Sequence, residues 1–132
     1  MLRHIALQVK ENDIQGFYTE ILGGKILHQF TLNEGDAKSL FQISGQIEVC
    51  RLSLNNLEFE LFIHDNIEKD CLQHLCLEMK GSKDIYSKAK EKGYWTRIRN
   101  SGDNDTYFIR DQNRNMFEIK TKPLWTEPCA YS

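Results

Sequence analysis

Two stretches decide the fold: His4-Ile5-Ala6-Leu7 near the start of the chain and His74-Leu75-Cys76-Leu77 in its second half. In both, apolar residues alternate along one face, which is the period of a half-buried β-strand. Each histidine is followed 19 positions later by a glycine, Gly23 or Gly93, which ends a predicted helix. The two halves of the chain are therefore an internal repeat.

The first half is predicted to run strand, helix and three strands. A helix capped by Asn12 or Asp13 carries an apolar stripe at helical spacing from Ile14 to Leu22. Asn55-Asn56 is a tight-turn signal, because asparagine tolerates a positive φ, and predicts a hairpin. The expected strands cover 2–9, 25–32, 46–54 and 57–63, with a short helical turn over 37–43.

The second half repeats this order. A polar helix over 83–92 is predicted to be capped by Ser82. Asn113 is expected to take the left-handed conformation in the loop between the last two strands. The expected strands cover 72–80, 94–99, 106–110 and 116–121, with a turn at 103–105 and a charged linker at 64–70. The prediction is one α+β domain over 1–132, with one module at 1–66, a second at 67–122 and a tail at 123–132.

Composition limits the classes of function. The chain has 132 residues, 40% hydrophobic and 27% charged, which is typical of one soluble globular domain. With 17 Lys and Arg against 19 Asp and Glu there is no basic block, so neither nucleic acid nor a membrane is an expected partner. The four cysteines form no CxxC pair and no apolar leader opens the chain, which predicts free thiols in the cytoplasm.

A histidine and a glutamate stand at matching places in the two halves. Each lies on the strand face opposite the regular apolar residues, so a curved sheet would turn both toward its concave side. Related by a pseudo-twofold, the halves would bring four such residues toward one point: His4, Glu60, His74 and Glu118. Two imidazoles and two carboxylates suit one divalent metal ion, Ni, Co, Zn, Mn or Fe, with two positions left open.

The sequence resembles the vicinal oxygen chelate superfamily, which includes glyoxalase I, extradiol dioxygenases, bleomycin-resistance proteins and methylmalonyl-CoA epimerase. The likeness spans about residues 3–121. Besides the two histidine strands it rests on Phe17-Tyr18, Leu22-Gly23, Glu60-Leu61-Phe62, Tyr107-Phe108-Ile109-Arg110-Asp111 and Phe117-Glu118-Ile119.

The resemblance implies two βαβββ modules that form a curved mixed-sheet cup, the glyoxalase/bleomycin resistance/dioxygenase fold. It places His4, Glu60, His74 and Glu118 at the family's metal-ligand positions. It also implies a homodimer in which one metal draws ligands from two chains. Because four protein ligands are typical of the isomerases, the expected activity is that of a glyoxalase I-like lyase or isomerase.

In that reading the divalent ion binds two adjacent oxygens of a small-molecule substrate and stabilises the enediolate formed when a C–H proton leaves. Glu118 is expected to be the base, with Glu60 as its partner. Gln8 and His64 stand where bacterial glyoxalase I has residues that bind glutathione, so a glutathione-linked substrate is not expected.

Two alternatives remain at this point: a metal-free protein that binds a small molecule or antibiotic, and an Fe(II) ring-cleaving dioxygenase. Cys76, on the concave face, is expected to be a small buried thiol. Arg97, Arg99 and Arg110 could steer an anionic substrate. Trp125 and Tyr131 in the tail could cover the cup or lie at a dimer edge.

Overall fold

The computed structural model describes residues 1–65, 71–101 and 104–121. Part of the predicted linker and the predicted tail, with Trp125, Cys129 and Tyr131, lie outside these ranges. The first module contains β1 (Ile5–Val9), α1 (Glu11–Asp13), η1 (Ile14–Thr19), β2 (Lys25–Leu32), α2 (Glu34–Asp36), η2 (Ala37–Phe41), β3 (Ile47–Leu54) and β4 (Leu57–Ile63). The second contains β5 (His74–Met79), α3 (Ser82–Glu91), β6 (Trp95–Ser101), β7 (Asn104–Arg110) and β8 (Met116–Thr121).

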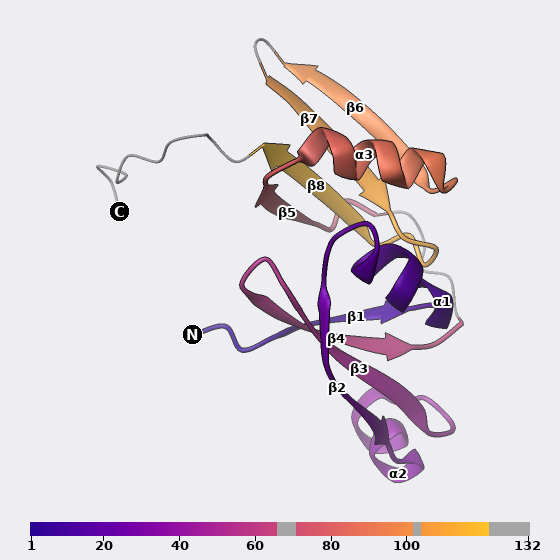
Figure 1. The fold of residues 1–132 in the computed structure, drawn as a ribbon. Helices are drawn as coiled ribbons and strands as arrows, with labels where there is room; N and C mark the ends of the chain where they lie inside the picture. The colour runs from indigo at the N-terminus through magenta and orange to yellow at the C-terminus, as the bar shows by residue number, and fades with distance from the viewer. Residues whose placement is uncertain (66–70, 102–103, 122–132) are drawn as a thin grey trace.

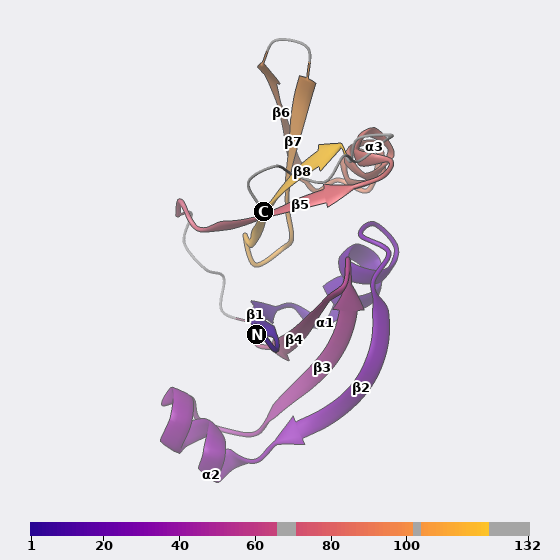
Figure 2. The same ribbon diagram turned by 90° about the vertical axis from the view of Figure 1, so that its left-hand side faces the viewer.

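Each module forms its own four-stranded sheet, and the two sheets have the same topology (Figure 1). Their strand orders are β1-β4-β3-β2 and β5-β8-β7-β6. In both, the first strand is parallel to the last, and the other pairs are antiparallel. This is the predicted βαβββ repeat, and the α+β fold class is confirmed. Figure 2 shows how strongly β2 and β3 curve, which gives the first sheet a concave face.

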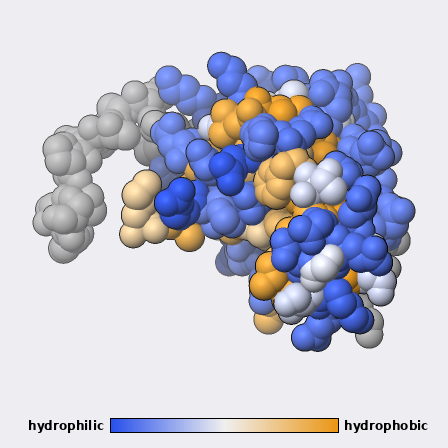
Figure 3. Space-filling model, turned by 90° about the horizontal axis from the view of Figure 1, so that it is seen from below, coloured by the Kyte–Doolittle hydropathy of each residue, from blue (hydrophilic) through white to orange (hydrophobic). Residues whose placement is uncertain are grey.

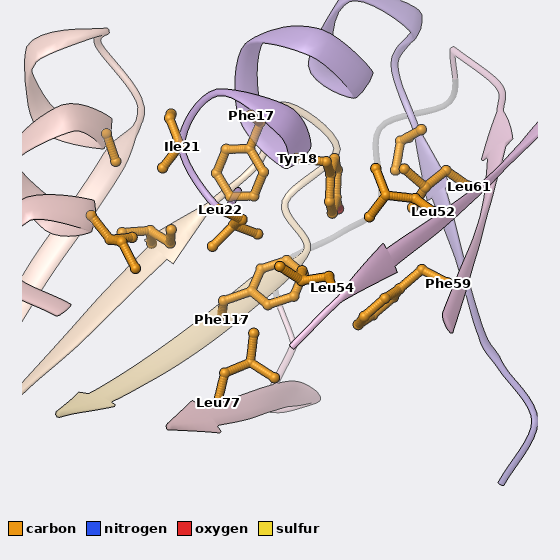
Figure 4. Packing of buried hydrophobic residues seen from close by; sticks show 14 of the residues in the cluster. Phe17, Tyr18, Ile21, Leu22, Leu52, Leu54, Phe59, Leu61, Leu77 and Phe117 are labelled. Atoms are coloured by element: carbon orange, nitrogen blue, oxygen red, sulfur yellow. The ribbon is translucent and has the colours of Figure 1, made fainter. Parts of the chain in front are cut away.

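The helix of the first module supplies the core between the two sheets. Phe17 and Tyr18 are fully buried, and each ring lies with its centroid 5.9 Å from that of Phe117 on β8. Figure 4 shows these side chains between Leu52 and Leu61 of the first module and Phe117 of the second. The predicted apolar stripe thus packs against both modules. Burial of such large aromatic side chains is a principal source of stability.

Two tyrosine–aspartate hydrogen bonds join the modules reciprocally. The Tyr18 hydroxyl donates to Asp111 at 2.6 Å, and the Tyr94 hydroxyl donates to Asp13 at 2.7 Å. Burial raises the pKa of the Asp111 carboxyl, although hydrogen bonds from Asn115 and Tyr18 act against this. Burial, together with the charge of Asp111, also holds the pKa of Tyr18 well above its ordinary value, so the phenol remains the donor.

The predicted helix caps are wrong, because tertiary contacts take the capping groups. The first helix has Lys10 as its N-cap, without a side-chain cap bond. The Asp13 carboxylate instead accepts from Gln112 of the second module. The second-module helix has Gly81 as its N-cap, and the Ser82 hydroxyl pairs with Thr121.

The left-handed residue of the loop between β7 and β8 is also not the predicted one. Arg114 has φ 71°, whereas Asn113 is fully buried and donates its side-chain amide to the His64 carbonyl. The Asn55-Asn56 turn is confirmed, with φ values of 51° and 63°. Positive φ at both central residues gives a turn whose twist matches that of a hairpin.

Three of the four cysteines lie in the described ranges. Cys50, Cys71 and Cys76 are free thiols, as predicted for these three. Cys76 is exposed, so its predicted burial is wrong. Within the described ranges no helix has the length and apolar character needed to cross a bilayer.

Candidate metal centre

The first candidate pair lies on neighbouring parallel strands of the first sheet. In the register of β1 with β4, Ala6 lies opposite Glu60, and His4 precedes Ala6 by two positions. Two positions is one full period of a strand, so His4 and Glu60 belong to the same face. Their side chains meet, with 3.2 Å between His4 Nε2 and Glu60 Oε1.

The second pair repeats this arrangement in the second sheet. Cys76 lies opposite Glu118 in the register of β5 with β8, and His74 precedes Cys76 by two positions. The distance between His74 Nε2 and Glu118 Oε1 is 3.1 Å. The same offset between the same two strands therefore produces the same contact twice.

The geometry of both pairs fits two adjacent ligands of one divalent ion. Ligands at 90° on an ion with bonds of about 2.1 Å lie about 3.0 Å apart. The His74 Nδ1 lies 2.9 Å from the Leu72 carbonyl oxygen, which can only accept, so Nδ1 carries the hydrogen. The Nε2 of the neutral ring then presents a lone pair to Glu118, and two facing lone pairs need a proton or a cation between them.

The four predicted residues do not meet within one chain. Among the side chains that the structure describes, no group of three or more His, Cys, Asp or Glu is placed to hold an ion. The structure brings together His4 with Glu60, and His74 with Glu118, and keeps the two pairs apart. A pocket of about 370 Å³ between the modules is lined by residues of β1, β5 and β8, among them His74, Ala6 and Met116.

An arginine that the sequence analysis did not single out contacts the first pair. Arg51 on β3 lies opposite Glu60, and its guanidinium donates to Glu60 Oε2 at 3.0 Å. This pairing could have been derived from the sequence. Leu54 and Leu57 close the two-residue hairpin turn, and Arg51 and Glu60 each lie three positions farther from the turn, so they face each other across the two strands. Both oxygens of Glu60 are therefore engaged, and its side chain is only 10% exposed.

Glu118 is held less firmly. The nearest cation to its second oxygen, among the described residues, is the Lys120 ammonium at 3.8 Å. Its side chain is 18% exposed, and that of Lys120 is 52% exposed. An exposed lysine at this distance contributes little, since the interaction is screened by water.

Other residues noted in the sequence take different places. The side chains of Gln8 and His64, which share the concave face with Glu60, hydrogen-bond to each other at 3.1 Å. The guanidinium groups of Arg97 and Arg110 each lie 4.9 Å from the centre of the Trp95 ring. Such cation–π contacts orient the arginines on the second sheet.

Comparison of the sequence with models of protein families finds no match, and comparison with curated proteins finds none either. Solved structures do match. The fosfomycin resistance protein FosX from Listeria monocytogenes has a TM-score of 0.72 at 15% identity, covering 94% of both chains. A glyoxalase family protein from Enterococcus faecalis has a TM-score of 0.65 at 20% identity, covering 91% of this chain and 96% of the other.

FosX from Mesorhizobium loti is also similar, with a TM-score of 0.66, 11% identity, and coverage of 94% and 93%. A Listeria FosX structure with a TM-score of 0.70 contains Mn(II) and 1S,2S-dihydroxypropylphosphonic acid. At these identities the likeness establishes the fold and leaves the reaction open. It confirms the expected glyoxalase/bleomycin resistance fold.

Proposed function

We propose that this protein is a divalent-metal lyase or isomerase of the glyoxalase I type, acting on a small molecule that carries two neighbouring oxygens. The observation that carries this proposal is the repetition of one His–Glu contact, at 3.2 Å and 3.1 Å, in both modules. If the two histidines were merely solvated surface residues, the same contact with a glutamate at the same strand offset would not be expected in both modules. Two imidazoles and two carboxylates suit Ni, Co, Zn, Mn or Fe.

The second part of the proposal is that the site is completed by a second copy of the chain. Each module supplies one imidazole and one carboxylate, whereas four ligands are needed to leave an octahedral ion two open positions. A homodimer in which the first module of one chain faces the second module of its partner would give two such sites. The separation of the two pairs within one chain supports this arrangement.

The carboxylates are assigned different roles. A bound divalent ion would supply Lewis acidity toward two adjacent substrate oxygens as a C–H proton leaves. Glu118 takes that proton, because the nearest cation to its second oxygen, within the described part of the chain, is the exposed Lys120 at 3.8 Å, which restrains it little. Glu60, held on both oxygens by His4 and Arg51, remains in place as a ligand.

Subunit complementation tests the shared site. His4→Ala and His74→Ala homodimers should each bind no ion, since each breaks one half of every site. Heterodimers formed by mixing them would contain one site with both halves intact, so about a quarter of all sites should recover metal. Recovery of none, with heterodimers shown by native mass spectrometry, would contradict a site shared between chains.

Proton transfer is tested by deuterium exchange. The metal-loaded protein is incubated in D2O with hydroxyacetone and 2-hydroxyacetophenone, and loss of the C–H signal beside the carbonyl is followed by NMR. We expect exchange in the wild-type protein and a large loss in Glu118→Gln. Stoichiometric metal without exchange, but with oxygen consumption, would favour the dioxygenase alternative. Absence of metal would favour a binding protein.

A further inference from the structure

The concave face of the first sheet changes from polar to apolar along its strands. On β4, Phe62 follows Glu60 on the same face, and on β3 the residues opposite them are Val49 and Arg51. Two positions along a strand span about 7 Å. An apolar surface therefore begins one step from the His4–Glu60 pair.

The segment between β2 and β3 turns this apolar surface into a pocket. Asn33 caps it by accepting the Asp36 amide at 2.8 Å, and η2 then brings the fully buried Ala37 against Ile47 and Val49. The ring of Phe41 lies 5.6 Å from that of Phe62, measured between centroids. The walls are almost entirely carbon, and the polar side chains at the rim, Gln8 and His64, hydrogen-bond to each other.

The size of the pocket limits what it can hold. Its volume is about 170 Å³. An apolar cavity of about 150 Å³ is enough to bind benzene and to exclude water. The pocket thus has room for one phenyl ring or one branched aliphatic group of similar size.

The geometry points to a substrate with two parts: an oxygen-bearing head at the His4–Glu60 pair and a phenyl-sized apolar group in the pocket beneath η2. This inference rests on the proposed function for the head and on the pocket for the apolar group. Because the lining is apolar apart from Gln8 and His64, a polar group on the occupant would lose its hydration without gaining a hydrogen bond over most of the wall. The pocket therefore favours an apolar group over a polar one.

The surrounding surface favours a small molecule over a macromolecule. Leu40 and Phe41 on η2 are 65% and 53% exposed. Figure 3, which views the end of the molecule that carries α2, shows hydrophobic residues in separate patches among hydrophilic ones. An apolar docking surface for a protein would form one continuous patch, whereas the hydrophobic residues in this view are separated by hydrophilic ones.

A matched pair of ligands tests the inference. Hydroxyacetone and 2-hydroxyacetophenone have the same vicinal oxygens and differ in a methyl against a phenyl group. Titration calorimetry with the Mn²⁺-loaded protein should show the phenyl compound binding about ten- to fiftyfold more tightly. Phe41→Ala, which opens the pocket wall, and Ile43→Trp, which fills the pocket, should both reduce that ratio at least fivefold. Leu40→Ala, a neighbouring exposed change outside the lining, should preserve it.

Failure of the pocket and failure of the proposed function give different results. Bound metal with equal affinity for the two ligands would overturn the pocket, as would equal effects of Phe41→Ala and Leu40→Ala. In metal-free protein, toluene should give NMR contacts with the methyl groups of Ile43 and Ile47. Such contacts in a protein that binds no metal would support the pocket and remove the proposed function. Contacts between Trp125 and Ile47 without ligand would show that the chain fills its own pocket, which also overturns the inference.

Discussion

The His4–Glu60 and His74–Glu118 pairs share a backbone frame but have different neighbours. The frame sets the histidine two positions before the residue opposite the glutamate in both sheets. Around it, the Arg51 guanidinium contacts Glu60 at 3.0 Å, whereas the nearest cation to the second oxygen of Glu118, among the residues that the structure describes, is the exposed Lys120 at 3.8 Å. Topology therefore places the donor atoms, while the neighbouring strand determines how freely each carboxylate can move.

The largest expected effect is the loss of bound metal when either His4 or His74 is replaced. His4→Ala and His74→Ala should each abolish binding of about one divalent ion per chain, because each removes a ligand from every shared site. Metal content is measured by elemental analysis and folding by circular dichroism. His28→Ala is the control, since His28 is exposed and stacks on Phe30. Retention of stoichiometric metal in the variant that carries both His4→Ala and His74→Ala would exclude the proposed metal site.

The next effect separates the two carboxylates. Glu118→Gln keeps an oxygen near the ion but removes the base, so the exchange rate should fall by about 10² to 10⁴ while metal affinity falls modestly. Glu60→Gln should be milder, because Glu60 is a ligand in our proposal. NMR exchange rates and metal titration measure the two quantities. If Glu118→Gln is fully active, the base is Glu60 or a water.

The reciprocal contacts between modules should differ in energy. Tyr18→Phe leaves buried Asp111 without one donor and should lower the free energy of unfolding by about 1–3 kcal/mol. Tyr94→Phe should cost less, because Tyr94 is half-buried whereas Tyr18 is fully buried, so water can replace the lost hydrogen bond more easily. Urea denaturation of the two variants compares these free energies. A larger cost for Tyr94→Phe would reverse the assignment.

The smallest effect concerns the cations beside the two glutamates. Arg51→Gln should destabilise the metal-free protein by about 1 kcal/mol, because Glu60 then keeps one partner at a poorly exposed position. Bound metal should reduce this cost by neutralising the same carboxylate. Lys120→Gln should change the melting temperature little with or without metal. Equal shifts in the two variants would show that Glu60 and Glu118 are held alike.

Much of the fold followed from local patterns in the sequence. Alternation of apolar residues located the strands, and Asn55-Asn56 located the hairpin turn, because both depend on neighbours in the chain. The caps could not be found this way, since Asp13 and Ser82 have the right side chains for a cap but use them in contacts with distant segments. Long-range partners override local preference when the group is buried.

The sequence by itself determined the repeat, the face on which His4, Glu60, His74 and Glu118 lie, and the βαβββ order, since strand periodicity is a local property. Only the tertiary structure decided that these residues form two separate pairs and that η2 closes a pocket beside them. The physical reason is that module packing, and the pairing of strands not joined by a tight turn, depend on contacts between residues far apart in the chain, which no local pattern encodes.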